Sequence, residues 1–320
     1  MKIALVGNYP EGTYEAFEKK LPQNIEMLKF ETQEKFDTLS EADCVVLRTL
    51  KMPKEIIENI KNLKFIQRWG TGFDTVDIQA AGQKGIIVAN AQGVNAVAVA
   101  EMTISLILSI YRNIVNHNIE LKKGVWTKEM YTDRTFTLNG KVVGLIGTGS
   151  IGRKVSSIAQ AFGAEIQYFD LYRMNEMDEA KYQMRYLPFN DLISTSDIIS
   201  IHVPLTEETK HMINSENIKL MKPNAILINT SRGGIVNERD LVAALNNNKI
   251  LGAGIDCPEH EPISPDDPLL KLDNVVLTPH VGGTSADLKN NMINVVTQNI
   301  INFYNDAPIN YIVNKEFIKK

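Results

Sequence analysis

Short apolar runs alternate with helical patterns through residues 1–95. The apolar runs predict buried parallel strands at Ile3–Val6, Cys44–Leu47, Phe65–Gln67 and Ile86–Ala89. Amphipathic or capped patterns between them predict helices at Tyr14–Lys20, Glu55–Asn62 and Asp77–Lys84. Alternation of this kind favours a parallel sheet with helices on its faces.

A long helix from Ala96 to about Arg112 is apolar on all sides, which is typical of a buried connector. The polar run from Gly124 to Asn139 then predicts an irregular segment. Beyond it the alternation resumes, with strands expected at Val142–Ile146, Glu165–Phe169, Ile198–Ile201, Ala225–Asn229, Ala253–Ile255 and Val275–Leu277. Helices are expected at Lys154–Phe162, Phe189–Thr195, Ser215–Leu220, Asn237–Asn246 and Asp287 to about Tyr304. The last helix is expected to return to the first domain.

Bulk properties narrow the class of protein. A chain of 320 residues suggests two domains at roughly 150 residues each. With 34 Lys+Arg against 38 Asp+Glu, the net charge is −4, and no basic cluster with aromatics indicates nucleic-acid binding. We see no membrane span, signal peptide or metal-binding pattern, and two cysteines form no disulfide framework. We therefore expect a soluble cytoplasmic protein with neither nucleic-acid nor membrane partners.

The strand Val142–Ile146 runs into a Gly-x-Gly-x-x-Gly pattern formed by Gly147, Gly149 and Gly152. Gly147 permits a tight turn, Gly149 admits a pyrophosphate to the backbone, and Gly152 allows the helix to pack closely. The free N–H groups at the start of that helix would face the anion. Glycine-rich turns also occur for packing reasons alone, so the pattern needs support from its surroundings.

That support is Asp170, which ends the next strand 170 − 147 = 23 residues after the first glycine. An acid about 20 residues on binds the adenosine ribose hydroxyls and would repel a 2′-phosphate, so NAD is favoured over NADP. Arg173 could instead accommodate that phosphate, but we interpret it as a solvated surface charge.

Three polar residues follow strands of the second half, where ligands bind in open α/β sheets. They are Arg232, Glu261 and His280, and each has a plainer interpretation as a surface charge, a solvated acid or a packed histidine. Beside a dinucleotide site they suit a dehydrogenase. Histidine exchanges a proton near neutrality, a carboxylate orients it, and arginine grips a substrate carboxylate. In the first half, the loop around Thr71 and Gly72 is either an anion-binding nest or an ordinary glycine-rich turn.

Several motifs in order resemble the D-isomer-specific 2-hydroxyacid dehydrogenase family, over essentially the whole chain. They are Gly70–Asp74, Asn95–Glu101, the glycine pattern, His202–Thr206, Asn229–Gly234, Asp256–Pro262 and Pro279–Gly283. The resemblance implies a Rossmann doubly wound parallel-sheet nucleotide domain at 96–284. It would be inserted in a smaller flavodoxin-like α/β substrate domain formed by 1–95 plus 285–320. It also implies a homodimer through the nucleotide domains, with Gly124–Trp126 as the dimer arm.

The same resemblance implies roles for individual residues. Arg232, Glu261 and His280 would be catalytic, and Thr71, Gly72 and Asn95 would bind the substrate carboxylate. The residues implied at NAD are Gly147, Gly149, Ser150, Ile151, Gly152, Asp170, Val203, Pro204, Thr209, Thr230 and Asp256. Trp69 and Cys257 depart from the family pattern.

The substrate remains open among 2-hydroxy acids. The segment Val46–Thr49 looks most like phosphoglycerate dehydrogenases, in which an arginine at the position of Arg48 reaches the phosphate. Arg48 is equally interpretable as a surface arginine that interacts with an acid such as Asp74. Hydroxypyruvate or glyoxylate reductase and D-lactate dehydrogenase are alternatives. More remote are formate or phosphite dehydrogenases, in which the formate branch carries Gln where this chain has Glu261, and NAD-sensing corepressors on the same scaffold.

Overall fold

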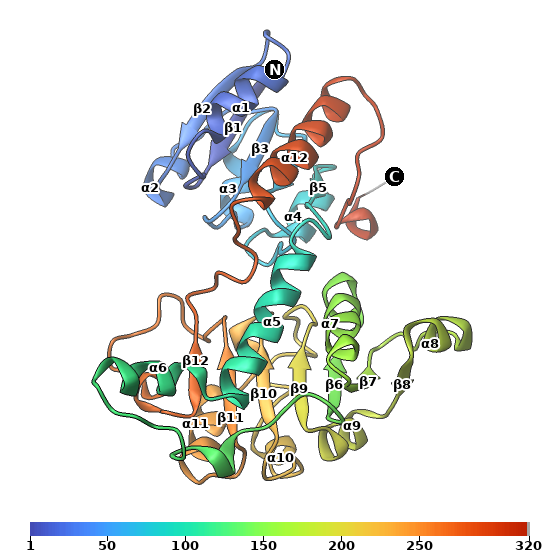
Figure 1. The fold of residues 1–320 in the computed structure, drawn as a ribbon. Helices are drawn as coiled ribbons and strands as arrows, with labels where there is room; N and C mark the ends of the chain where they lie inside the picture. Colours follow the sequence, from blue (N-terminus) through green and yellow to red (C-terminus); the bar gives the residue numbers. More distant parts are fainter. Residues whose placement is uncertain (319–320) are drawn as a thin grey trace. The chain divides into compact units, whose positions relative to one another are not determined.

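The computed structural model describes residues 1–318. The chain divides into two compact units, one built from Met1–Asn95 and the segment that begins at Ser285, the other from Ala96–Thr284. Figure 1 shows a sheet with covering helices in each of them.

The first unit holds a five-stranded sheet in the order β2-β1-β3-β4-β5, with every pair parallel. This is the 2-1-3-4-5 order of flavodoxin-like folds. Its strands are β1 (Lys2–Val6), β2 (Glu26–Phe30), β3 (Cys44–Leu47), β4 (Phe65–Arg68) and β5 (Ile87–Ala89). Its helices are α1 (Thr13–Lys20), α2 (Gln33–Phe36), α3 (Lys54–Asn59), α4 (Ile78–Gln83), α12 (Leu288–Tyr304) and the 3₁₀ helix η4 (Lys315–Phe317).

Two apolar layers cover the faces of this sheet, because successive strand residues point to opposite sides. On one face Leu5 and Val46 join a core with Phe17 of α1 and Val296 of α12. The other face packs alternate residues of the same strands against α2, α3 and α4. The long C-terminal helix α12 therefore packs in the core of the first unit.

The second unit holds a seven-stranded sheet in the order β12-β11-β10-β9-β6-β7-β8, again wholly parallel. The order reverses at β6, which lies between β9 and β7, as in a doubly wound Rossmann sheet. Its strands are β6 (Val142–Ile146), β7 (Glu165–Phe169), β8 (Met184–Tyr186), β9 (Ile198–Ile201), β10 (Ile226–Asn229), β11 (Gly252–Ile255) and β12 (Val275–Leu277). The predicted fold class is confirmed.

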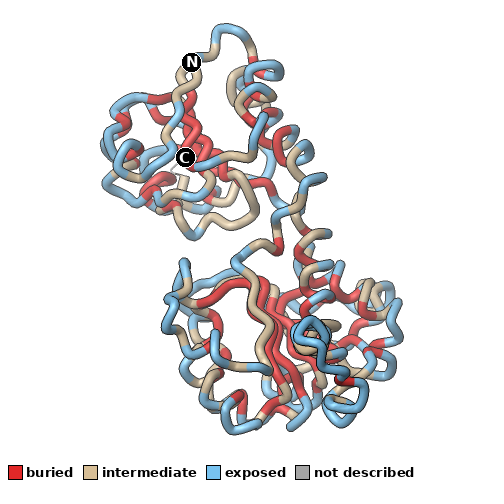
Figure 2. The backbone as a smooth tube through the Cα atoms, turned by 60° about the vertical axis from the view of Figure 1, so that its left-hand side comes forward, coloured by how far each residue is buried: buried red, intermediate tan, exposed pale blue. Residues whose placement is uncertain are grey.

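Helices cover both faces of this second sheet, and its central strands form the buried band in Figure 2. They are α5 (Ala96–Tyr111), α6 (Ile114–Lys122), α7 (Ser150–Ala161), α8 (Glu176–Tyr182), α9 (Phe189–Thr195), α10 (Ser215–Ile218) and α11 (Glu238–Asn246). Three 3₁₀ helices complete the unit, η1 (Thr132–Arg134), η2 (Gly233–Ile235) and η3 (Pro268–Lys271). Helix α5 packs on α7 and on β10 and β11, which buries side chains such as Ile104, Leu106 and Ile107, whereas Val97 near its start is exposed. Within residues 1–318 no single helix is long and apolar enough to cross a membrane, and only the bent pair α5–α6 reaches that length and composition jointly.

The sequence pattern did not predict the edge strands β2 and β8 or the helices α2, α6 and α8. β2 has no fully buried residue, and neither α6 nor α8 buries a side chain. Without a buried face, β2, α6 and α8 lack the apolar periodicity on which such a prediction depends. β8 and α2 each bury one residue, but at three and four residues they are too short to show a period. The fingerprint helix also begins earlier than expected, at Ser150 rather than Lys154.

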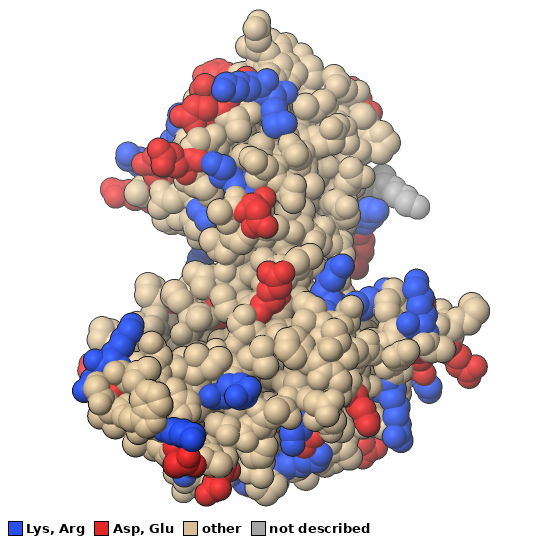
Figure 3. All heavy atoms as spheres, viewed as in Figure 1, with Lys and Arg blue, Asp and Glu red and all other residues tan. Residues whose placement is uncertain are grey.

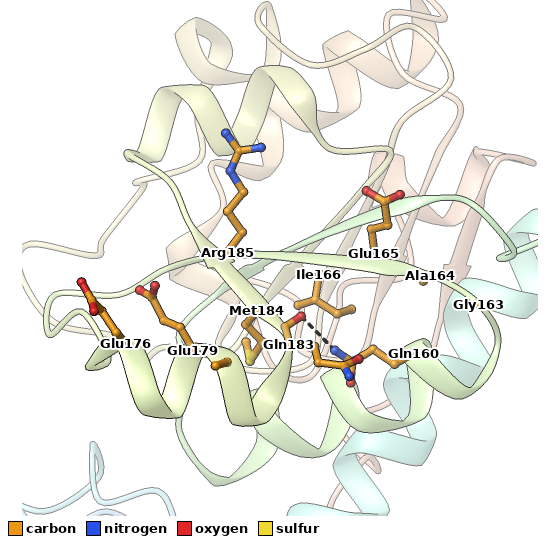
Figure 4. A pocket seen from close by; sticks show the side chains of 11 residues that line it. Gln160, Gly163, Ala164, Glu165, Ile166, Glu176, Glu179, Gln183, Met184 and Arg185 are labelled. Atoms are coloured by element: carbon orange, nitrogen blue, oxygen red, sulfur yellow. Dashed lines mark hydrogen bonds between the residues drawn. The ribbon is translucent and has the colours of Figure 1, made fainter.

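Charged side chains of both signs are interspersed on the face in Figure 3. A shallow hollow of about 670 Å³ lies between α7, α8 and the start of β7, lined by Glu165, Glu179 and Arg185 among others. Figure 4 shows it together with the hydrogen bond from Gln160 to the carbonyl of Gln183. It opens at the amino end of β7, whereas ligands of open α/β sheets bind at the carboxyl ends. We assign it no function.

Candidate functional site

The glycine loop after β6 has the geometry that a dinucleotide requires. Gly147 has φ of +96°, and a Cβ there would lie 2.7 Å from the carbonyl oxygen of His202. A Cβ on Gly152 would overlap the carbonyl oxygen of Gly147, whereas one on Gly149 would meet nothing within 4 Å. The turn and the helix packing thus account for two of the glycines, and the third leaves open space at the start of α7. The fit is that of a pyrophosphate cradle.

Asp170 is anchored against this loop at the end of β7. Its Oδ2 accepts hydrogen bonds from the N–H of Thr148 at 2.8 Å and from the Thr148 hydroxyl at 2.9 Å. Its Oδ1 accepts from the N–H of Tyr172 at 3.2 Å. The carboxylate is therefore fixed beside the glycine loop. No feature of the sequence indicated this role for Thr148.

Arg173 is exposed, as expected, but it is not simply solvated. Its guanidinium makes two hydrogen bonds to Glu179, at 2.9 and 3.2 Å, and lies over the ring of Tyr186. These contacts hold Arg173 in a pair with Glu179, away from any role as a free cation for a 2′-phosphate.

The segment after β9 carries the residues implied at the adenosine. Thr209 closes it by donating to the carbonyl of Pro204 at 2.7 Å and accepting from the N–H of Thr206 at 2.8 Å. Val203 is partly buried and packs against the core beneath. These bonds give the loop a defined shape beside the glycine turn.

His202, at the start of this segment, is a partly buried histidine for which the sequence motif implied no role. Its Nε2 bonds the Ser200 hydroxyl at 2.9 Å, while its Nδ1 has no hydrogen-bond partner among the described residues. Burial lowers the pKa of His202 to about 3, so the ring is neutral. It adds no positive charge to the cradle.

Arg232, Glu261 and His280 all lie beyond the carboxyl ends of neighbouring strands β10, β11 and β12. Arg232 is held by its own segment, since its carbonyl accepts from Asn229 at 2.8 Å and its Nη1 donates to the carbonyl of Ser231 at 2.7 Å. A Cβ on Gly233 would overlap the backbone of Pro258. The arginine segment therefore lies directly against the loop that carries Glu261.

His280 and Glu261 form a pair, with the ring Nδ1 at 2.9 Å from both carboxylate oxygens. Their side chains remain 39% and 44% exposed, which leaves them accessible to a ligand. With Nδ1 engaged by the carboxylate, Nε2 is the ring nitrogen left to exchange a proton with a substrate. The arrangement is that of an oriented general acid–base group.

Asp256 holds the histidine loop in place. Its side chain is buried, and it accepts from the Thr278 hydroxyl at 2.5 Å and from the N–H groups of Val281 and Gly282 at 3.0 and 2.9 Å. Its carbonyl accepts from the N–H of His280 at 2.7 Å. The resemblance implies Asp256 at the cofactor, and in the structure its bonds fix the loop that carries His280. Thr230, implied at the same end, pairs through its hydroxyl with Thr103 of α5 at 3.0 Å.

In the first unit, Thr71, Gly72 and Asn95 lie in one small network. The Thr71 hydroxyl donates to Asn95 Oδ1 at 2.8 Å, and the Thr71 carbonyl accepts from Asn90 at 2.7 Å. Arg68, almost fully buried, donates to the carbonyl of Gly72 at 2.9 Å. This loop is built by specific hydrogen bonds and is more than an ordinary turn. Arg68 had no assigned role in the sequence analysis.

Two neighbours complete this region of the first unit. Trp69 packs edge-on against Tyr9 and stacks on Phe17, so its large side chain is accommodated in an aromatic cluster. Arg48, at the end of β3, is partly buried and donates from Nη1 to the carbonyl of Asn8.

Comparison with known proteins identifies the family of this chain. Residues 104–282 match the family model described as "D-isomer specific 2-hydroxyacid dehydrogenase, NAD binding domain". The chain belongs to this family. A glyoxylate reductase of Thermococcus litoralis is 39% identical over 290 residues, covering 88% of this chain and 86% of the relative. A hydroxypyruvate reductase of Thermotoga maritima is 41% identical over 262 residues, covering 80% and 83% respectively.

A third relative is much longer than this chain, so the match covers a smaller share of it. The D-3-phosphoglycerate dehydrogenase of Methanocaldococcus jannaschii is 39% identical over 269 residues, which is 84% of this chain but 51% of that protein. Together these findings confirm the predicted family, the enzyme class and the nicotinamide cofactor. The chain is an NAD-dependent oxidoreductase that interconverts 2-hydroxy and 2-oxo acids. The roles of individual residues stay predictions.

Proposed function

We propose that this chain uses NADH to reduce a small, unphosphorylated 2-oxo acid, glyoxylate or hydroxypyruvate, to its 2-hydroxy acid. The observation that carries the proposal is the His280–Glu261 pair, 2.9 Å apart, at the same sheet edge as the glycine loop. Two reductases of these substrates, 39% and 41% identical over most of their length, support this choice.

The residues of the chain divide the work of the reaction. Bound NADH supplies the hydride that reaches the carbonyl carbon. His280, protonated, gives the proton from Nε2 to the carbonyl oxygen, so the oxo acid gains one hydride and one proton. Glu261 orients the ring through Nδ1 and stabilises its charged form.

Arg232 would bind the substrate carboxylate through two parallel hydrogen bonds and polarise the adjacent carbonyl. Its place beside the Glu261 loop supports this role. Thr71, Gly72 and Asn95 are proposed to bind substrate. The amide of Asn95 would act as a donor, since its Oδ1 already accepts from Thr71.

We propose further that the enzyme prefers NAD over NADP and acts in the cytoplasm as a homodimer. The anchored carboxylate of Asp170 supports the cofactor preference. Exposed apolar side chains on and after α6, including Leu121, Val125 and Trp126, support a second copy as the partner, because monomers seldom expose a contiguous apolar surface.

Steady-state turnover against a panel of substrates tests the proposal. NADH oxidation should be fastest, by kcat/KM, with glyoxylate or hydroxypyruvate, and slower with pyruvate and 3-phosphohydroxypyruvate. Oxidation of formate by NAD should be undetectable. If no 2-oxo acid were reduced while NADH still bound, the proposal would fail in favour of a non-catalytic NAD-sensing role.

Arg48 supports a second candidate, a substrate with a distal phosphate such as 3-phosphohydroxypyruvate. Its guanidinium lies at the carboxyl end of β3 and is partly buried, and burial lowers its pKa from the ordinary value. A charge-assisted hydrogen bond to phosphate is worth about 1.5–3 kcal/mol. Arg48→Ala should then reduce kcat/KM for the phosphorylated substrate by roughly 10- to 150-fold.

The control for this variant is the unphosphorylated substrate, hydroxypyruvate, which lacks the group that Arg48 would bind. Lys54→Ala removes an exposed cation of the same unit and should affect neither substrate. Equal losses for both substrates in Arg48→Ala, or none, would remove the case for a phosphate and leave the reductase activity as proposed.

A further inference from the structure

Cys257 lies beside the catalytic pair. A sulfur, a carboxylate oxygen and a ring nitrogen of Cys257, Glu261 and His280 all lie within 4.8 Å of one another. The cysteine is fully buried and not disulfide-bonded, whereas the other two side chains are partly exposed. The residues are four and nineteen positions apart in the chain, so no sequence spacing indicated the group.

These three ligand types are those that zinc prefers. Tetrahedral Zn²⁺ with bonds of about 2.0–2.3 Å to Cys, His and carboxylate places its ligand atoms about 3.4–3.6 Å apart. The ring nitrogen and carboxylate, now 2.9 Å apart, would separate slightly, and the half-exposed Glu261 and His280 side chains would close on the fixed thiol. The fourth position would stay open to water or to a ligand.

We propose that Cys257, Glu261 and His280 form an inhibitory binding site for a soft divalent cation of the zinc type. A metal at this site takes the place of the proton between the His280 ring and Glu261. The thiol proton and that proton pass to solvent, since zinc binds thiolate and unprotonated imidazole. The consequence for turnover rests on the acid–base role proposed for His280.

Inhibition follows from the loss of both functions of the pair. A metal-bound ring cannot cycle between its charged and neutral forms, and Glu261 no longer stabilises the charged form. Zinc should therefore lower the rate of NADH oxidation, and a chelator should restore it.

The test compares Zn²⁺ inhibition in the wild type and in cysteine variants of the full chain. Cys257→Ser and Cys257→Val should keep turnover but need about 10-fold or more zinc for half-inhibition, because a ligand is lost. Cys44→Ser, which alters the other buried cysteine, should behave as the wild type. Equal zinc sensitivity in all variants, or none in the wild type, would overturn the proposal.

A spectrum independent of turnover separates this proposal from the proposed function. Co²⁺ added to the NAD⁺ complex should give a thiolate-to-cobalt charge-transfer band in the wild type and Cys44→Ser. The band should be missing in both Cys257 variants. If every 2-oxo acid failed as a substrate, the proposed function would be wrong. The charge-transfer band would still show whether Cys257 binds the metal. A band that persisted in both Cys257 variants, or never appeared, would overturn it.

Discussion

At the scale of single residues, the site depends on one strained histidine and the acid that holds it. His280 has φ of 52°, in the left-handed region that non-glycine residues seldom adopt. Such a conformation costs of order 1–3 kcal/mol and persists only where neighbours determine it. Asp256 holds His280 in this conformation. Its side chain accepts three hydrogen bonds from the loop, and its backbone carbonyl accepts one from the N–H of His280. The buried acid thus positions the loop of His280, the residue proposed to transfer the proton.

Replacement of Asp170 is expected to change the preference between NADH and NADPH. Asp170→Ser should raise kcat/KM with NADPH relative to NADH by about 10-fold or more, because like-charge juxtaposition at an interface costs several kcal/mol. Part of the NADH activity should fall as well, since the serine cannot keep both bonds to Thr148. Parallel kinetics with the two cofactors measure the ratio.

Arg173→Ala is the matched control, because its guanidinium is occupied by Glu179. It should leave the cofactor ratio unchanged. Wild-type enzyme that used both cofactors equally well would contradict the role given to Asp170.

The sequence could predict which residue types follow which strands, and this located His280, Glu261 and Arg232. It could not predict the residues that hold two other candidate site residues, Gly72 and Asp170. Arg68 is itself fixed by a hydrogen bond to the carbonyl of Leu47, and Thr148 bonds the carboxylate of Asp170, so both contacts join segments distant in the chain. Such bonds depend on the tertiary fold, and a buried arginine at a strand end was the only local signal.

At the scale of elements, the junction of β6 and α7 offers a matched pair of glycines. Gly149→Ala should change the stability of the cofactor-free protein by less than about 1 kcal/mol, because a Cβ there meets no protein atom within 4 Å. It should nevertheless weaken NADH binding, since the methyl would occupy the approach of the pyrophosphate. Thermal unfolding and NADH titration separate the two effects.

Gly152→Ala should lower both the stability of the cofactor-free protein and its affinity for NADH. Its Cβ would overlap the Gly147 carbonyl, and overpacking of this kind costs typically about 1–3 kcal/mol. An NADH affinity that stayed normal in Gly149→Ala would show that the loop does not approach the cofactor as described.

The elements that the sequence predicted are those with buried faces. The central strands, such as Cys44–Leu47 and Ile198–Ile201, are buried along their length, and continuous apolar runs mark strands of this kind. Helix α8 gave no apolar signal, but its Asn175 cap and acidic first turn are visible in the sequence and would have marked its start. The other elements that were not predicted depend on tertiary packing, which a local sequence pattern does not show.

At the scale of the whole molecule, the exposed side chains of α6 and the segment after it predict self-association. Trp126 is 78% exposed and Leu121 56% exposed, beside other apolar residues. Trp126→Glu with Leu121→Lys should convert a dimer to a monomer in light scattering, because charges are depleted from interface cores. Met177→Glu, at an equally exposed apolar position on α8, should leave the dimer intact. A wild-type monomer at all concentrations would contradict the dimer.

The central claim, that His280 transfers the proton, is tested most directly by the turnover of His280→Ala with its NADH affinity measured alongside. General acid–base catalysis contributes roughly 10²- to 10⁴-fold, so kcat for the preferred 2-oxo acid should fall by that factor while the NADH dissociation constant stays near the wild-type value. His260→Ala, an exposed histidine in the same loop as Glu261, should retain its turnover. Near-normal turnover in His280→Ala, or a comparable loss in His260→Ala alone, would contradict the account.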